Sequence, residues 1–205
     1  MTPETFSHLA HFEALYAHSD DPWNVRGAWY EQRKRAVLLA SLGRERYRSA
    51  FEPGCGNGEL SSALAARCER LLCSDGAASA VAAAQRRLHG VADAASCLPT
   101  IEQRRLPHEW PTDTRFDLIV ISELAYYFDR HGLDQMLGAA RDCLEPGGEL
   151  VMCHYLPAFD DRVLATETAH GLAHALPGLA SALQHRDALF LLEVWRRTPP
   201  SEVAP

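Results

Sequence analysis

The hydrophobic positions of this chain alternate between two spacings. Apolar residues that recur every three or four positions predict helices with one buried face, here over residues 6–17, 23–42, 59–68, 77–88, 133–144 and 161–175. Short apolar runs between them predict strands, at residues 49–53, 70–74, 98–103, 116–122, 149–155, 182–186 and 189–196. Strands that alternate with helices are typical of an open, doubly wound α/β sheet, whose ligands bind at the carboxyl ends of the strands.

The strand expected at the centre of this sheet is residues 116–122, FDLIVIS. This run is continuously apolar and contains β-branched side chains, as in a strand that is buried on both faces. Glycines mark several ends of elements. Gly43 and Gly90 follow predicted helices, and the sequence PGG at 146–148 predicts a tight turn before the next strand.

The most informative stretch is a glycine loop, PGCGNG, between the first predicted strand and its helix. Gly54, Gly56 and Gly58 have no β-carbon, so the backbone can adopt positive φ angles and a ligand can lie directly against it. The N-terminus of the following helix offers free N–H groups. The next strand leads to Asp75, whose carboxylate is suited to accepting two hydrogen bonds from a ribose diol.

Three kinds of nucleotide-binding loop compete for this pattern. The dinucleotide fingerprint requires a third small residue where this chain has Glu59. The P-loop requires a Gly-Lys-Ser/Thr sequence, which is absent here. What remains is Glu52 followed by glycines at alternate positions from Gly54 to Gly58. This arrangement resembles motif I of the class I S-adenosylmethionine-dependent methyltransferases, and the acid before the glycines fits a cationic ligand.

The resemblance extends along nearly the whole chain, because FEPGCGNGEL, LLCSDG, RFDLIVISELAYYF, CLEPGGELVMCHY and FLLEVWRR follow in the family's order. More narrowly, DPW, WYEQRKRAVLLASL, SELAYYF, CHY and ETAH resemble the NodS family, whose members methylate the amine of a deacetylated chitooligosaccharide. The resemblance implies S-adenosylmethionine as methyl donor, S-adenosylhomocysteine as product and a mixed sheet whose last strand is antiparallel. The acceptor is not carried over, because this fold hosts many substrates.

The resemblance also implies which residues bind the donor. Glu52 is expected at its amino group, Asp75 at its ribose, and Lys34 and Trp23 near its carboxylate. On sequence alone Lys34 could equally be an exposed helix charge and Trp23 a core aromatic. The adenine is expected beside residues 104–106, where the two arginines could equally be solvated. The full expected set is Trp23, Lys34, Glu52, Gly54, Cys55, Gly56, Gly58, Asp75, Gly76, Arg104, Arg105, Leu106 and Glu123.

Methyl transfer from a sulfonium is an in-line displacement, so positioning of donor and acceptor supplies most of the rate. An amine acceptor must still lose a proton, which a carboxylate or a neutral histidine can take directly or through water. Glu123, His154 and His170 are the candidates, with polar rim residues and an exposed helix histidine as the plainer alternatives. Tyr126 and Tyr127 could contact a methylated ammonium by cation–π attraction; one of them could instead be core.

Two further patterns in the sequence bear on function. His170 and His174 lie four residues apart on a predicted helix, which is half of a metal site, but no HExxH sequence and no third ligand accompany them. No metal is therefore expected.

Residues 20–34 precede the first strand and contain Trp23 and Trp29, so they are expected to act as a lid over the donor. The alternative is a segment packed permanently against the sheet.

Composition narrows the class of protein. The length of 205 residues predicts one domain, taken as residues 1–197, with 198–205 as a disordered tail. The net charge of −7 argues against nucleic acid as a partner. No apolar window of about 18 residues predicts a membrane span. The six cysteines form no CxxC pair and the N-terminus does not resemble a signal peptide, so a reduced, cytoplasmic protein is expected.

The sequence thus predicts an enzyme that methylates a small molecule, with an amine as the preferred acceptor and an oligomeric state left open. An O-methyltransferase is the main alternative. A nicotinamide-dependent oxidoreductase and an inactive binding module are the other two; the first is disfavoured by Glu59, and the second by the intact glycines and strand-end acid.

Overall fold

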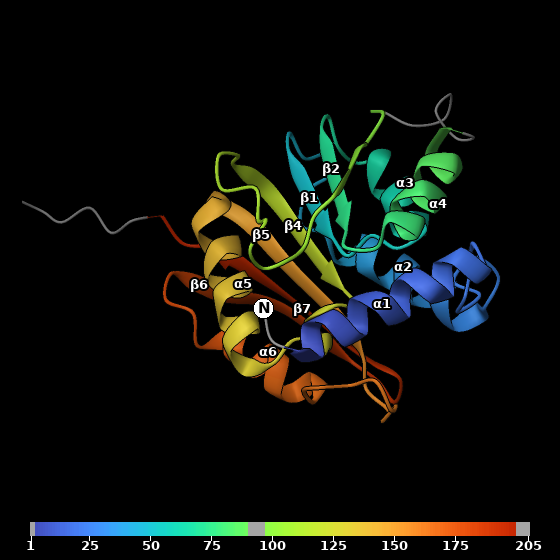
Figure 1. The fold of residues 1–205 in the computed structure, drawn as a ribbon. Coiled ribbons are helices and arrows are strands. Elements are labelled where there is room, and N and C mark those ends of the chain that lie inside the picture. Colours follow the sequence, from blue (N-terminus) through green and yellow to red (C-terminus); the bar gives the residue numbers. More distant parts are fainter. Residues whose placement is uncertain (1–2, 90–96, 200–205) are drawn as a thin grey trace, which may run out of the picture.

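The computed structural model describes residues 3–89 and 97–199. In this part of the chain seven strands form one sheet in the order β3-β2-β1-β4-β5-β7-β6 (Figure 1). Neighbouring strands from β3 to β5 are parallel, and β7 is antiparallel to both β5 and β6. The predicted mixed, doubly wound sheet with an antiparallel last strand is confirmed. The strands are β1 Ala50–Pro53, β2 Leu71–Asp75, β3 Thr100–Gln103, β4 Phe116–Ser122, β5 Leu144–Tyr155, β6 Leu179–Arg186 and β7 Phe190–Arg197.

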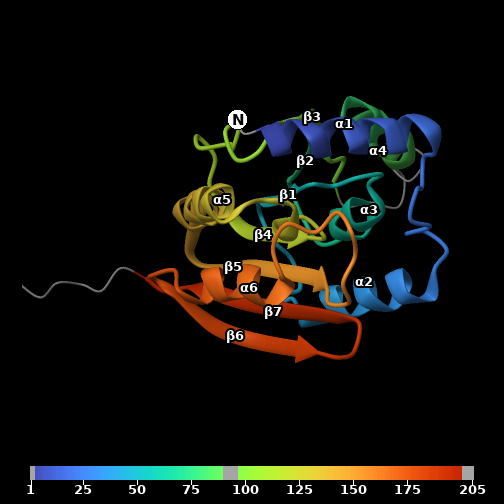
Figure 2. The same ribbon diagram turned by 60° about the horizontal axis from the view of Figure 1, so that its bottom comes forward.

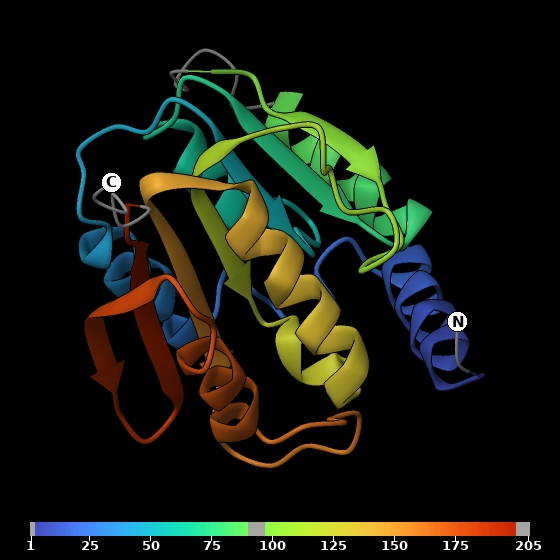
Figure 3. The same cartoon turned by 90° about the vertical axis from the view of Figure 1, so that its left-hand side faces the viewer.

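Helices cover both faces of the sheet. One hydrophobic core lies between the sheet and α2, α3 and α4, and a second lies between the sheet, α5 and α6. Figure 3 shows α5 crossing the second face, with α6 below it. Helix α1 packs beside α4, as Figure 2 shows. The helices are α1 Pro3–His18, α2 Trp29–Ser41, α3 Glu59–Ala65, α4 Ala78–His89, α5 Arg130–Cys143 and α6 Thr166–His174, with a 3₁₀ turn, η2, at Ala125–Tyr127.

The central strand β4 has the predicted bounds and divides the two cores. Leu118 and Val120 belong to the core under α2, α3 and α4, whereas Ile119 and Ile121 belong to the core under α5 and α6. Successive side chains of a strand point to opposite faces, so a strand that is covered on both sides must be apolar throughout. Its carboxyl end is therefore held firmly from two sides.

The second helix begins at Trp29 and not at the predicted residue 23. The carboxylate of Asp21 accepts hydrogen bonds from the backbone N–H groups of Val25 (2.7 Å) and Arg26 (3.1 Å). Asn24 adopts a φ of 54°, outside the right-handed helical region. Asp21 therefore closes a local turn that competes with a helix, as short polar side chains commonly do.

Glycine positions also differ from the predictions. Helix α2 ends at Ser41, the next residue Leu42 is extended, and Gly43 donates its N–H to the Glu149 carboxylate (3.1 Å) instead of capping the helix. The predicted turn at 146–148 lies inside β5, where Gly147 has a φ of 75° and the pairing with β4 shifts register. Gly90 lies outside the described residues.

The C-terminal elements are placed differently from the predictions in two respects. Helix α6 begins at Thr166 and not at 161, because the N–H groups of Val163 and Leu164 donate to the Tyr126 carbonyl instead of forming a helical turn. Of the predicted tail, Thr198 donates its N–H to the carbonyl of Gly178 (2.9 Å). Residues 200–205 lie outside the described part of the chain.

The cysteines are free thiols, and Cys97 is the one that is not fully buried. No described helix combines the length and the apolar character needed to cross a membrane.

Candidate active site

A cavity of about 840 Å³ lies at the carboxyl ends of β1, β2 and β4, bounded by α1, α2 and the segment between them. All but one of the residues expected to bind the donor line this cavity; they are Trp23, Lys34, Glu52, Gly54, Cys55, Gly56, Asp75, Gly76, Arg104, Arg105, Leu106 and Glu123. Tyr127 lines it as well. The exceptions among the predicted site residues are Gly58, His154 and His170.

The glycine loop has the backbone conformation that the sequence predicts. Gly54, Gly56 and Gly58 have φ angles of 71°, 53° and 80°, which side chains disfavour. A β-carbon on Gly56 would collide with the hydroxyl of Tyr16 on α1. A β-carbon on Gly58 would lie 3.3 Å from the Cα of Ala84 on α4. Gly56 therefore leaves room for the Tyr16 hydroxyl at the cavity wall, whereas Gly58 lets the start of α3 pack closely on α4.

Asp75 ties the end of β2 to the glycine loop. One of its carboxylate oxygens accepts a hydrogen bond from the N–H of Gly56 (3.0 Å), and the other accepts one from the N–H of Ala77 (3.0 Å). Burial raises the pKa of Asp75, and these backbone hydrogen bonds oppose the rise. The carboxylate thus lies in the cavity wall, next to the loop.

Glu52 is a buried acid on the cavity wall, at the end of β1. Burial raises its pKa to about 7, against the opposite effects of the Ser61 and Cys73 side chains. The Cys73 thiol lies 3.7 Å from Oε2. A cation placed beside a buried carboxyl favours its ionised form and lowers its pKa. Glu52 is therefore suited to a positively charged ligand.

Lys34 and Glu123 also line the cavity and form an ion pair. The Lys34 ammonium also contacts Glu31 (2.9 Å), and the side chain of Lys34 is 5% exposed, so it is not an exposed helix charge. Burial lowers the pKa of Lys34, but the carboxylates of Glu123 and Glu31 outweigh burial and raise it. Glu123 also accepts hydrogen bonds from the Tyr126 hydroxyl and the Tyr155 N–H. Its φ of 53° is uncommon outside glycine and occurs often at functional sites.

Aromatic rings form the mouth of the cavity. The ring of Tyr127 packs on Phe12 (4.9 Å between centroids) and on Phe159 (6.0 Å). Trp23 packs on Phe12 (6.1 Å) and Tyr16 (5.6 Å) and is 46% exposed. Trp23 is therefore a partly covered wall residue and not a core aromatic.

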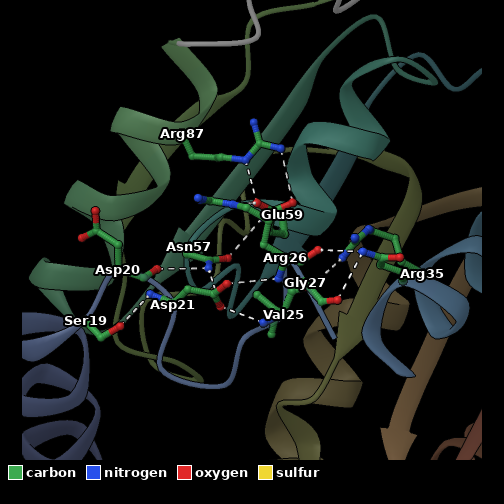
Figure 4. A network of polar contacts seen from close by, with 11 residues as sticks. Ser19, Asp20, Asp21, Val25, Arg26, Gly27, Arg35, Asn57, Glu59 and Arg87 are labelled. Carbon is green, nitrogen blue, oxygen red and sulfur yellow. Dashed lines mark hydrogen bonds and ion pairs between the residues drawn. The ribbon is translucent and has the colours of Figure 1, made fainter. Parts of the chain in front are cut away.

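The segment that carries Trp23 is tied to the glycine loop by polar contacts (Figure 4). The Asn57 amide donates to the Asp21 carboxylate (3.2 Å), and Arg26 donates to Glu59 (2.7 Å). Glu59 also pairs with Arg87 of α4. Neither Asn57 nor Glu59 could be singled out as a site residue from the sequence, because Asn57 fits no motif and Glu59, the first residue of α3, only excluded the dinucleotide fingerprint.

The residues after β3 line the cavity as predicted. The guanidinium of Arg104 pairs with Glu102 (2.6 Å), and the N–H of Arg105 donates to Glu109 (2.6 Å). Arg104 is therefore partnered and not simply solvated.

The two candidate histidines lie behind the cavity and not on it. His154 is fully buried, and its Nε2 accepts a hydrogen bond from the Ala125 N–H (3.0 Å). His170 is 2% exposed and contacts Glu193 on β7 (2.7 Å), so it is not an exposed helix histidine. A base must reach the proton that it removes. The predicted role of His154 and His170 as bases does not fit these positions, which leaves Glu123 as the predicted base on the cavity wall.

Comparison with known proteins identifies the family. The family model described as Nodulation protein S (NodS) matches residues 13–153. The chain belongs to the NodS family. Nodulation protein S of Rhizobium tropici is 32% identical over 135 residues, 65% of this chain and 54% of that protein. Nodulation protein S of Bradyrhizobium diazoefficiens is 34% identical over 109 residues, 53% of this chain and 49% of that protein. The chain thus spans about half the length of the curated relatives it matches.

Solved structures resemble the chain over more of its length. A Pseudomonas syringae protein named as a candidate methyltransferase is 42% identical, with a TM-score of 0.72, and the match covers 83% of this chain and 100% of that one. NodS of Bradyrhizobium japonicum WM9 in complex with S-adenosylhomocysteine is 24% identical, with a TM-score of 0.77, and covers 95% and 98%. The predicted NodS family is confirmed, and the predicted fold is confirmed as one shared with solved methyltransferases.

Proposed function

We propose that this chain is an S-adenosylmethionine-dependent methyltransferase that methylates the nitrogen of a small-molecule amine. The observation that carries the proposal is the meeting of three features in one cavity: the glycine loop with Gly54 and Gly56, the strand-end acids Glu52 and Asp75, and the Lys34–Glu123 ion pair. Membership of the NodS family supports both the donor and a nitrogen acceptor.

The residues present fit this donor. The positive φ angles of Gly54 and Gly56 leave bare backbone on the cavity wall. The volume of about 840 Å³ falls in the usual range of about 300–1,000 Å³ for small-molecule sites. When bound, S-adenosylmethionine supplies an electrophilic methyl group on a positively charged sulfonium.

The walls can orient such a ligand at several points. Glu52 is suited to an ammonium group and Asp75 to a ribose diol, because each is a carboxyl in the cavity wall. Lys34 is suited to binding the carboxylate of the donor, with its ammonium group still paired to Glu123 and Glu31. These contacts hold the donor in one pose, and effective molarity supplies most of the acceleration in a displacement of this kind.

Glu123 is the residue proposed to handle the acceptor. With S-adenosylmethionine held by Glu52, Asp75 and Lys34, an amine acceptor that received its methyl group would have to lose one proton from the nitrogen. The Glu123 carboxylate lines the cavity and can accept that proton directly or through water. The rings of Tyr127 and Phe159 lie at the same mouth and can pack on an ammonium.

The acceptor class follows from this combination of acids and aromatic rings. An amine, including the amine of an aminosugar or oligosaccharide, fits a mouth that contains Tyr127, Phe159 and Asp161. A phenol lacks the charge that these groups recognise.

A donor-dependent screen tests the proposal. Purified chain is incubated with S-adenosylmethionine and separate panels of amines, aminosugars and phenols, and S-adenosylhomocysteine formation is measured. Turnover is expected with members of the amine panels and is expected to fall at least tenfold in Glu123→Gln. Turnover with phenols alone would contradict a nitrogen acceptor.

A further inference from the structure

A row of buried polar side chains runs from the η2 turn, past α6, to the strand β7. His154 on β5, His170 on α6 and Glu193 on β7 are 0%, 2% and 1% exposed. His154 Nδ1 lies 3.0 Å from His170 Nε2, and His170 Nδ1 lies 2.7 Å from Glu193 Oε2. None of the three lines the cavity, so the proposed transfer of the methyl group leaves them without a role.

The direction of this hydrogen-bond chain is fixed at one end by the backbone. An N–H group can only donate, so the Ala125 N–H makes His154 Nε2 an acceptor without a proton. A neutral His154 then carries its proton on Nδ1 and donates it to His170 Nε2. His170 in turn carries its proton on Nδ1 and donates it to Glu193. Both rings are thus neutral, and each tautomer determines the next.

Glu193 is held in place by further donors at the far end. Its Oε1 accepts hydrogen bonds from Gln184 (2.6 Å) and from His174 Nε2 (2.8 Å). Trp195 donates its indole N–H to His174 Nδ1 (3.3 Å), which fixes that ring as well. His174 shares the carboxylate with His170 but is 44% exposed and has no contact with His154.

The end of the hydrogen-bond chain at Ala125 holds the part of the active site that carries Glu123. Ala125 begins the η2 turn, two residues after Glu123. The Tyr126 hydroxyl donates to the Glu123 carboxylate, and Tyr127 lines the cavity. A shift of the Ala125 N–H would therefore move two groups together: the Tyr126 hydroxyl, which donates a hydrogen bond to Glu123, and the ring of Tyr127 in the cavity wall.

We propose that His154, His170 and Glu193 are positioning residues whose directed hydrogen bonds hold the Ala125–Tyr127 turn, and with it Glu123, in the arrangement needed for methyl transfer. This inference rests on the proposed function, since it assigns the turn to that same site. None of the three residues touches the reacting atoms.

Protonation of His170 would disrupt the hydrogen bonds of His154 in a defined way. A proton added to His170 occupies Nε2, which then faces the proton on His154 Nδ1. His154 can restore that hydrogen bond only by moving its own proton to Nε2, where it meets the Ala125 N–H. One proton taken up near α6 therefore removes the hydrogen bond at the turn, about two side chains away.

The surroundings oppose this protonation. His154 is faced by the Tyr126 ring and has the Lys34 ammonium nearby; His170 is faced by Glu193 and has His174 and Glu167 nearby, and Glu167 is paired with Arg186. Burial lowers the pKa of His154, and His170 and Lys34 lower it further. Burial also lowers the pKa of His170, against the opposite effect of Glu193. The hydrogen bonds from Ala125 through His154 and His170 to Glu193 are thus intact at neutral pH.

Nuclear magnetic resonance of the full ¹⁵N-labelled chain, with S-adenosylhomocysteine added, tests the proposal without any acceptor. At pH 8 both His154 and His170 are expected to carry the proton on Nδ1. As the pH falls, the Ala125 amide shift is expected to move with the same midpoint as His170. A proton on His154 Nε2 at pH 8, or an Ala125 amide that does not move before the protein unfolds in acid, would overturn the proposal.

Two matched variants separate positioning from simple stability. His170→Gln keeps an acceptor for His154 but cannot take up a proton, so the acid movement of the Ala125 amide should disappear. His174→Gln removes a neighbour on the same carboxylate and should leave that movement unchanged. An identical Ala125 titration in His170→Gln and the wild type would contradict the account.

Activity adds a second readout once an acceptor is found. Turnover of the wild type, measured at saturating S-adenosylmethionine, should fall about tenfold per pH unit below the His170 midpoint. His170→Gln should lack this acid limb, and its presence there would contradict the role given to His170. If no acceptor is methylated, the proposed function is contradicted. The resonance experiment would still show whether His154, His170 and Glu193 hold the Ala125 turn.

Discussion

Lys34 and Glu123 lie 89 residues apart in the sequence and form an ion pair in the cavity wall. The lysine comes from α2, ahead of the first strand, and the glutamate follows the central strand β4. Glu31 and the Tyr126 hydroxyl complete the group. The pair therefore joins the helical N-terminal part of the chain to the carboxyl ends of the strands.

Removal of the Lys34 charge is expected to weaken donor binding. Lys34→Met leaves the carboxylates of Glu31 and Glu123 facing each other without a cation, which should cost about 1–3 kcal/mol of unfolding free energy. Affinity for S-adenosylhomocysteine should fall at least tenfold by titration calorimetry. Arg33→Met is the control, because Arg33 pairs with Asp187 and does not line the cavity. Equal donor affinity in the two variants would contradict the role of Lys34.

A side chain at Gly56 is expected to abolish donor binding in a protein that still folds. In Gly56→Ala or Gly56→Val the new β-carbon would collide with the Tyr16 hydroxyl at a φ that side chains disfavour. Gly138→Ala is the control, since nothing lies within 4 Å of a β-carbon there. Tyr16→Phe should partly restore binding to Gly56→Ala. Unchanged affinity in Gly56→Val would show that the donor does not lie against this loop.

Glu52 is expected to make both stability and donor binding depend on pH. Its folded pKa of about 7 is above its ordinary value of 4.5, so its contribution to stability is full below pH 4.5 and is lost as the pH rises through 7. The loss is about 3 kcal/mol. A cationic donor favours the ionised acid, so binding should release a proton near pH 6.

Calorimetry in buffers of different ionisation enthalpy measures this proton release. The proton should be absent in Glu52→Gln, which also separates Glu52 from the buried histidines. Their lowered pKa values act in the opposite direction, because stability from them falls as the pH drops below 6.5. Identical proton release in Glu52→Gln and the wild type would rule out Glu52 as its source.

The segment at residues 20–34 remains a predicted lid. Asp21, Asn57, Arg26 and Glu59 tie it to the glycine loop in this arrangement, with Trp23 at the cavity mouth. Hydrogen exchange should be fast for amides 21–30 in the free protein and clearly slower with S-adenosylhomocysteine. Asn57→Ala should weaken that protection. Strong and equal protection in both states would indicate a static segment.

Much of the fold could be predicted because local pattern and global architecture agree. The continuous apolar run of β4 predicts a buried strand, and the glycines of the loop predict positive φ angles; the structure has both. The start of α2 could not be predicted, since the Asp21 side chain takes the N–H groups that a helix would need. Propensity and periodicity do not register such a side-chain contact.

The site was predictable on its donor side and less so on its acceptor side. Motif order placed Glu52, Asp75, Gly54 and Gly56 on one rim, where they line the cavity, but also Gly58, which packs against α4 instead. It also placed His154 at a strand end, but not the direction of its side chain, which faces away from the cavity towards His170. Alternation along a strand gives the face of a side chain only when its register in the sheet is known.

The proposed function depends first of all on binding of the donor. Titration of the purified chain with S-adenosylmethionine and with S-adenosylhomocysteine is expected to show one site per chain, and each ligand should raise the melting temperature. NADH and ATP should do neither. A folded protein that binds neither S-adenosylmethionine nor S-adenosylhomocysteine would contradict the account.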